Sequence, residues 1–144
     1  MTEADKQKIS EIMERHGVIV GYLFGSAARG TMGSHSDIDL GVVFAVDNSE
    51  QDDFNRRVNL AHDISCALNV PEADIINLRT ARGPLIKYQA IFGGEVILEK
   101  DRDARFAVEQ SAVREYEDTR HLRRIRDDIL CQELQNGTFG KVFV

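Results

Sequence analysis

Residues 23–40 of the chain read LFGSAARGTMGSHSDIDL. An apolar run ends at a Gly-Ser pair, and a second apolar run begins with Asp37 and Asp39. Because side chains alternate along a strand, both aspartates would leave one face of it and the two aliphatic residues the other. Two like charges about 6–7 Å apart repel by about 3 kcal/mol at an effective dielectric near 20. A fold tolerates this repulsion in solvent or when a cation lies between the carboxylates, so the pattern indicates either an exposed pair or a cation site.

The Gly25-Ser26 turn lies between the two apolar runs. Glycine turns and helix starts present free backbone N–H groups, which suit a phosphate. Mg²⁺ prefers carboxylates together with substrate phosphates as its ligands. The two features together predict a site for a Mg-nucleotide.

The spacing of Gly25-Ser26, ten intervening residues and Asp37-x-Asp39 resembles the signature of the DNA-polymerase-beta-type nucleotidyltransferase superfamily. The strings FGSAARG and SDIDL resemble its minimal nucleotidyltransferase (MNT) branch, as do PLIKY at 84–88, GEVIL at 94–98 and REYED at 114–118. The resemblance covers nearly the whole chain. It implies an α/β (α+β) fold, in which a small mixed sheet is flanked by helices and followed by a C-terminal helical arm.

The resemblance also implies the roles of the site residues. Asp37, Asp39 and Asp74 would be the catalytic carboxylates and the ligands of two Mg²⁺ ions, with Asp74 coming from a later neighbouring strand and accepting the proton of the acceptor. A strand-end or capping role is the alternative for Asp74. Gly25, Ser26 and Arg29 would bind the nucleotide, although Arg29 could equally be an ordinary exposed arginine.

The function that the resemblance implies is transfer of AMP from ATP to a hydroxyl group. MNT proteins of this size resemble antitoxins that are encoded beside a HEPN-domain ribonuclease toxin and inactivate it by adenylylating a tyrosine. Two alternatives stay open: a non-catalytic antitoxin that neutralises its partner by contact alone, and a nucleotidyltransferase that acts on a small molecule such as an aminoglycoside.

Composition and charge indicate the class of protein and the partners that it can bind. The chain has 144 residues, 42% of them hydrophobic, which suits one soluble domain. No 18-residue apolar run and no signal peptide occur, so we expect a cytoplasmic protein without a membrane contact. The net charge of −6 disfavours binding of long nucleic acid, which requires many Lys and Arg contacts to phosphate. Cys66 and Cys131 lack metal-site spacing and are predicted to be buried thiols.

Periodicity divides the chain into a nucleotidyltransferase core, residues 1–100, and a helical arm, residues 101–144. Helices are expected near residues 3–16, 49–68 and 84–92, and strands at 18–24, 37–45, 73–78 and 95–99. The strand–helix–strand order over residues 37–78 predicts a crossover within one sheet. In the second helix we expect one helical stripe to face the core, made of Phe54, Val58, Ala61, Ile64 or Ser65, and Leu68.

The arm combines an apolar stripe with a basic flank. Leu122, Ile125, Ile129 and Leu134 keep helical spacing, and four arginines lie close beside them. Such a helix is expected to pack on its own domain or on a partner. An unbroken helix over residues 101–135 would span roughly 50 Å, long for a domain of this size, so a break is predicted.

Overall fold

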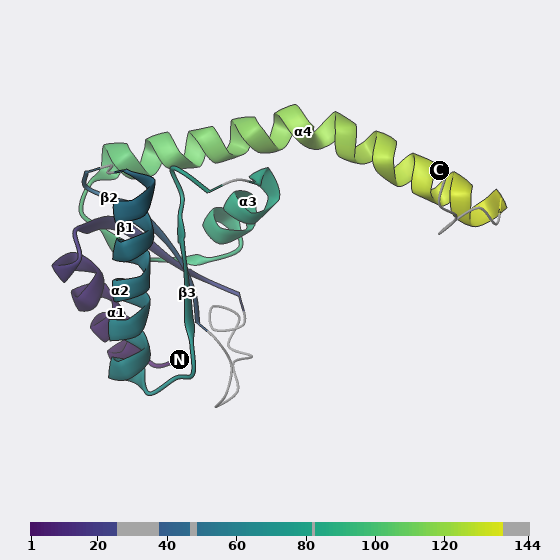
Figure 1. Cartoon of the computed structure of the whole chain (residues 1–144). Helices are drawn as coiled ribbons and strands as arrows, with labels where there is room; N and C mark the ends of the chain where they lie inside the picture. Colours follow the sequence, from purple (N-terminus) through teal and green to yellow (C-terminus); the bar gives the residue numbers. More distant parts are fainter. Residues whose placement is uncertain (26–37, 47–48, 82, 137–144) are drawn as a thin grey trace.

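The computed structural model describes residues 1–25, 38–46, 49–81 and 83–136. The described residues form helices α1 (Glu3–Arg15), α2 (Glu50–Leu68), α3 (Pro84–Phe92) and α4 (Arg102–Asn136), and strands β1 (Val18–Phe24), β2 (Ile38–Phe44), β3 (Ala73–Asn77) and β4 (Glu95–Glu99). The strands form one sheet in the order β3-β2-β1-β4 (Figure 1). β1 is antiparallel to β2 and β4, whereas β2 and β3 are parallel. The predicted small mixed sheet and the crossover through α2 are confirmed.

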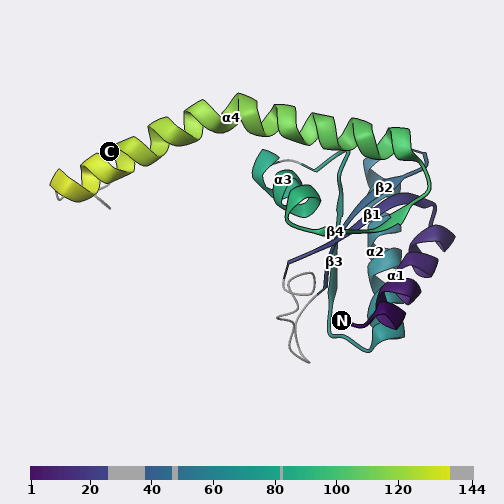
Figure 2. The same ribbon diagram turned by 180° about the vertical axis from the view of Figure 1, so that it is seen from behind.

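Helices cover both faces of this sheet. α1 and α2 pack on one face, and α3 with the first half of α4 on the other, as the opposite views of Figures 1 and 2 show. Each face has its own apolar cluster. Leu40 and Val42 belong to the α1–α2 side, and Tyr22 and Val43 to the α3–α4 side. β1 and β2 are therefore buried on both faces, which explains their nearly continuous apolar sequences.

Capping residues mark the starts of three helices. The side chain of Thr2 accepts a hydrogen bond from the N–H of Asp5, whose carboxylate accepts one from the N–H of Thr2 in return. These bonds hold the pKa of Asp5 below its ordinary value. Ser49 caps α2 through the N–H of Asp52, and Pro84 occupies the first turn of α3, where its missing N–H costs no hydrogen bond.

The predicted inward stripe of α2 is wrong in its first half. Leu60 and Ile64 are buried, whereas Phe54 and Val58 are 54% and 48% exposed. Two neighbouring stripes of this helix carry apolar residues at helical spacing, and the sequence alone cannot choose between them. The sheet decides: β3 is its edge strand, so the side of α2 that extends past β3 has no further strand of the described sheet to pack against.

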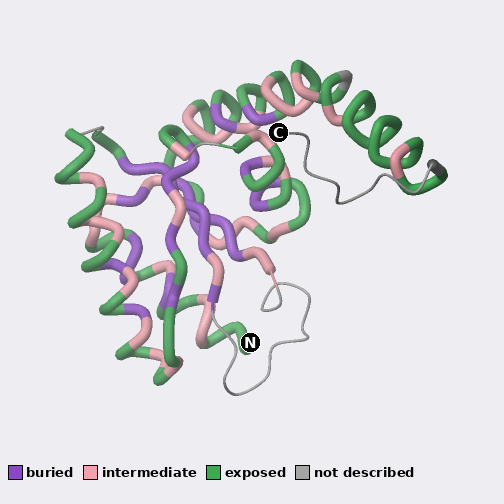
Figure 3. The backbone as a smooth tube through the Cα atoms, turned by 45° about the vertical axis from the view of Figure 1, so that its right-hand side comes forward, coloured by how far each residue is buried: buried purple, intermediate pink, exposed green. Residues whose placement is uncertain are grey.

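The predicted break in the C-terminal helix is also wrong. α4 is one helix of 35 residues, which spans roughly 50 Å at 1.5 Å per residue. It contains no glycine or proline, and pairs such as Arg105–Glu109 stabilise it one turn apart. Val108 and Ala112 of its first half are buried, while its second half extends past the core and is mostly exposed (Figure 3).

Three smaller features complete the description of the fold. His16 is partly buried, and its Nε2 lies 2.6 Å from Oδ2 of Asp63, which joins α1 to α2. Cys66 and Cys131 are exposed rather than buried, because both lie on outward faces of their helices. Within the described residues, no helix has the length and apolar character needed to cross a membrane.

Candidate active site

The strands bring two of the predicted carboxylates together at one end of the sheet. Asp39 near the start of β2 is the register partner of Asp74 near the start of β3. Register partners on parallel strands point to the same face, and adjacent strands lie about 4.8 Å apart. Asp39 is partly buried and Asp74 is exposed. The two carboxylates therefore lie side by side, one toward the sheet interior and one toward its edge.

Gly25, directly after the end of β1, lies against the Asp39 carboxylate. The last residue of β1, Phe24, is the register partner of Asp39, so the chain turns directly beside that aspartate. Gly25 has a φ of +74°, and a Cβ placed on it would overlap the Asp39 carboxylate. Glycine is thus required here both by the backbone conformation and by the close approach of the carboxylate. The predicted phosphate turn and the predicted metal ligand are in contact.

The described residues include only part of the predicted set. Gly25, Asp39 and Asp74 come together, whereas Ser26, Arg29 and Asp37 lie outside the described residues, so their roles stay predictions. In the described ranges no group of three or more His, Cys, Asp or Glu could hold a metal ion. The donor set that is present nevertheless fits a hard divalent cation, because two adjacent carboxylates supply oxygen ligands and leave positions for nucleotide phosphates.

A buried amide that sequence reasoning missed holds β3 in place. Asn77, at the end of β3, is buried; it donates a hydrogen bond to Oδ1 of Asp53 on α2 at 2.6 Å. Its own Oδ1 accepts from the backbone N–H of Arg79 at 3.0 Å. These bonds fix the edge strand to α2 and hence fix the position of Asp74. A single asparagine in a strand carries no local signal of this role, since its partner lies 24 residues away.

Lys87 links α3 to α4 through an ion pair. Its Nζ is buried and donates to both carboxylate oxygens of Glu115 on α4, at 3.1 and 3.0 Å. Beside this ion pair, the rings of Tyr88 and Tyr116 stack with centroids 4.1 Å apart. The guanidinium carbon of Arg123 lies over the Tyr116 ring, 4.1 Å from its centroid. Together these contacts fasten α4 to α3.

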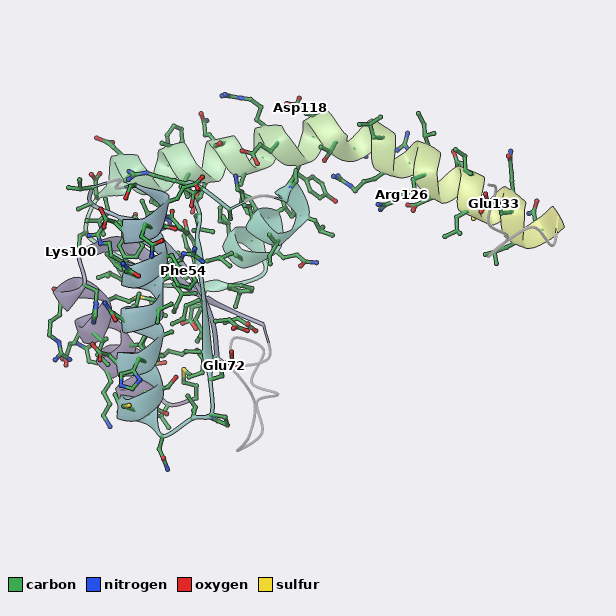
Figure 4. All side chains as sticks on the ribbon, viewed as in Figure 1. Phe54, Glu72, Lys100, Asp118, Arg126 and Glu133 are labelled. Carbon is green, nitrogen blue, oxygen red and sulfur yellow. The ribbon has the colours of Figure 1, made fainter. Side chains whose placement is uncertain are left out.

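A surface groove of about 480 Å³ lies between α2 and β3. Its walls come from α2, including Phe54 and Val58, and from residues 71–75. Figure 4 marks Phe54 and Glu72, which line it from α2 and from the segment before β3. The exposed apolar side of α2 is therefore one wall of a groove, and Asp74 is among the residues that line it.

Comparison with known proteins identifies the fold family. The family model described as "Polymerase beta, Nucleotidyltransferase" matches residues 7–103, about two-thirds of the chain. The chain belongs to this nucleotidyltransferase family. The match spans α1 to the start of α4 and so includes Gly25, Asp39 and Asp74. No curated protein sequence matches the chain.

Solved structures of toxin–antitoxin complexes share the nucleotidyltransferase fold of this chain. A chain of a toxin–antitoxin complex with AMP-PNP aligns with a TM-score of 0.71 at 23% identity, covering 87% of this chain and 98% of that one. A chain of the MntA–HepT toxin–antitoxin aligns with a TM-score of 0.67 at 20% identity, covering 90% and 99%. A chain of the complex of tri-AMPylated Shewanella oneidensis HEPN toxin with MNT antitoxin gives 0.68 at 21% identity, again covering 90% and 99%. At these identities the comparison shows the fold.

Proposed function

We propose that this nucleotidyltransferase transfers AMP from Mg-ATP to a hydroxyl group, that of a tyrosine, on a HEPN-domain toxin, and so acts as its antitoxin. The observation that carries the proposal is the placement of Asp39 beside Asp74, with Gly25 closed against the Asp39 carboxylate. The similar structures support the choice of partner, since one contains an AMPylated HEPN toxin with its MNT antitoxin and another contains AMP-PNP.

In the proposed reaction the acceptor oxygen forms a bond to the α-phosphorus of ATP. The bond from that phosphorus to the bridging oxygen breaks, and pyrophosphate leaves. The acceptor proton passes to the carboxylate of Asp74, which is exposed and can be reached by a hydroxyl group. Asp39 and Asp74, with Asp37 as the third predicted ligand, would hold Mg²⁺, which supplies charge stabilisation on the phosphate oxygens when bound.

Asp39 and Asp74 differ in solvent exposure, which suggests that they have different roles in the reaction. Asp39 is partly buried against the Gly25 turn, where backbone N–H groups suit the triphosphate. Asp74 is exposed on the edge strand, where an acceptor hydroxyl can reach it. We therefore assign the Gly25 side of the site to ATP and the exposed side, at the edge strand, to the acceptor protein.

The test is modification of a co-purified HEPN toxin, followed by intact-mass analysis with ATP and Mg²⁺ and with either one omitted. We expect the toxin to gain AMP only when both are present. Asp39→Asn and Asp74→Asn should each abolish or strongly reduce this gain. Asp128→Asn is the matched control, because it removes an exposed carboxylate from the second half of α4, away from the site.

Other outcomes would identify the alternatives. A toxin that is neutralised without any change in mass, by the wild type and by Asp39→Asn alike, would show that binding alone suffices. Turnover of ATP on an aminoglycoside, with no modified toxin, would show a small-molecule enzyme. Either result would refute protein AMPylation by this chain.

A further inference from the structure

The second half of α4 carries an apolar stripe that the core does not cover. Its members are between 38% and 66% exposed: Leu122, Ile125, Ile129, Leu130 and Leu134. Figures 1 and 3 show this part of the helix extending beyond the core. The Lys87–Glu115 ion pair and the Tyr88–Tyr116 stack fasten the helix just before the stripe begins. The described part of the chain therefore leaves the stripe uncovered.

The stripe continues the row of α4 that packs on the core. Val108 and Ala112 are buried in the first half of the helix, and Tyr116 follows four residues later against α3. Positions spaced by three or four residues stay on one side of a helix, and this row reaches Leu130 and Leu134 in the second half. There the same side of the helix has no described core beneath it and is still apolar. Exposed apolar patches of this kind mark interaction sites.

The stripe lies outside the nucleotidyltransferase family model. That model ends at residue 103, the second residue of α4, so the family domain does not include the stripe. The chain of the MntA–HepT toxin–antitoxin nevertheless aligns over 90% of this chain. Since 90% of 144 residues is about 130, the alignment extends to about residue 130 even if every unaligned residue lies at the C-terminus. The long helix is thus part of the fold that this chain shares with a chain of a toxin–antitoxin complex.

The two carboxylates of the candidate site point to the side of the sheet on which α4 lies. Side chains alternate along β2, so Asp39 points to the same face as Val43, which belongs to the α3–α4 cluster. Asp74, the register partner of Asp39, points to that face as well. A partner that lies along the stripe, beside α3, is therefore on the side of the sheet that both carboxylates face.

We propose that this stripe is the docking surface for the HEPN-domain toxin, with Arg126 at its centre facing a carboxylate of the toxin. The inference rests on the proposed function, which supplies the partner. Arg126 is exposed and lies four residues from Leu122 and four from Leu130, and within the described residues its guanidinium has no ion pair. An arginine among apolar residues suits a carboxylate that loses its water on binding.

The dissociation constant of the full-length chain for the HEPN toxin of the mass assay, measured by calorimetry without ATP, tests the proposal. Ile129→Glu places a charge in the apolar stripe, and Arg126→Glu reverses the charge at its centre. Each should weaken toxin binding about tenfold or more, because a charge that is buried without a partner is unfavourable. In the assay of AMP transfer, both variants should raise the KM for toxin and leave the rate at saturating toxin and the affinity for Mg-ATP unchanged.

Arg124→Glu is the matched control. It makes the same charge change as Arg126→Glu on a side of the helix about 160° away, and should keep toxin binding within about threefold of the wild type. Asp128 also lies about 160° from Arg126, so Asp128→Asn stays a valid control in the mass assay. These positions and Ile129 are all exposed, and unchanged helical circular dichroism is the check that each variant is folded.

Toxin binding as tight as that of the wild type in Ile129→Glu and Arg126→Glu would overturn the proposal, and so would an equal loss in Arg124→Glu. A wild-type chain that binds no toxin would overturn it too. If the two stripe variants bind toxin normally but lose a self-association that the wild type shows in sedimentation, a second copy covers the stripe instead.

The two measurements separate this inference from the proposed function. A toxin that binds through the stripe and gains no AMP would refute AMP transfer and leave the docking surface in place. A toxin that gains AMP equally from the wild type and from both stripe variants at low toxin concentration would refute the docking surface alone.

Discussion

Replacement of Gly25 by alanine tests the contact at the centre of the site. An alanine there must hold a φ of +74°, which costs a residue with a Cβ about 1–2 kcal/mol. The new Cβ also overlaps the Asp39 carboxylate. A terminal carboxylate can rotate away from the methyl group, so we expect the steric conflict to displace Asp39 rather than to unfold the chain. The free energy of unfolding should fall by about 1–2 kcal/mol.

The two consequences can be measured separately. For a chain of this size, the loss of stability corresponds to a fall in Tm of roughly 3–7 °C. Displacement of a reacting group by about 1 Å can cost roughly 100-fold in rate. We therefore expect Gly25→Ala to stay folded at 25 °C, to transfer AMP roughly 100-fold more slowly, and to bind Mg-ATP more weakly by calorimetry.

Gly83→Ala is the matched control for this substitution. Gly83 also has a positive φ, +111°, but an added Cβ would meet Ile86 Cγ2 at 3.6 Å, an ordinary contact. It should lose at least as much stability as Gly25→Ala and keep AMP transfer. Wild-type transfer by Gly25→Ala, or an equal loss of transfer in both variants, would refute the argument that Gly25 positions Asp39.

Three further changes have definite expected outcomes. Asp39→Asn should abolish AMP transfer and leave the Tm in chelator at or above that of the wild type, because it removes one of two repelling carboxylates; a marked fall in Tm would indicate a structural role. Asp74→Asn should lower the rate of transfer more than it lowers ATP affinity by calorimetry, and wild-type turnover would remove Asp74 from the site. Glu115→Gln should lower the free energy of unfolding in urea by about 1–3 kcal/mol, less than for a fully buried pair because Glu115 is 39% exposed, while Lys87→Met/Glu115→Leu should recover much of the loss. A Glu115→Gln variant as stable as the wild type would show that the ion pair does not hold α3 to α4.

Local sequence was sufficient for most of the elements. Short apolar runs predicted each strand to within about one residue, and Thr2, Ser49 and Pro84 lie at the helix starts, because capping and strand patterns depend on residues only a few positions apart. The Gly25–Asp39 spacing likewise predicted that the glycine turn and an aspartate of the next strand lie together, since turn chemistry and strand alternation are local properties. Asp74 entered through the family resemblance, because one aspartate in a strand has little meaning alone.

Contacts between distant segments decided the rest. The sequence could not choose which stripe of α2 faces the sheet, because that depends on β3 being an edge strand. It predicted a break in α4, because chain length alone does not reveal that Lys87 and Glu115, 28 residues apart, fasten the helix and let its second half continue unsupported. Only the register of β2 against β3 brought Asp39 beside Asp74, and only the turn at the end of β1 set Gly25 against the Asp39 carboxylate. These pairings depend on how segments far apart in the chain meet in the sheet, and no local pattern specifies that.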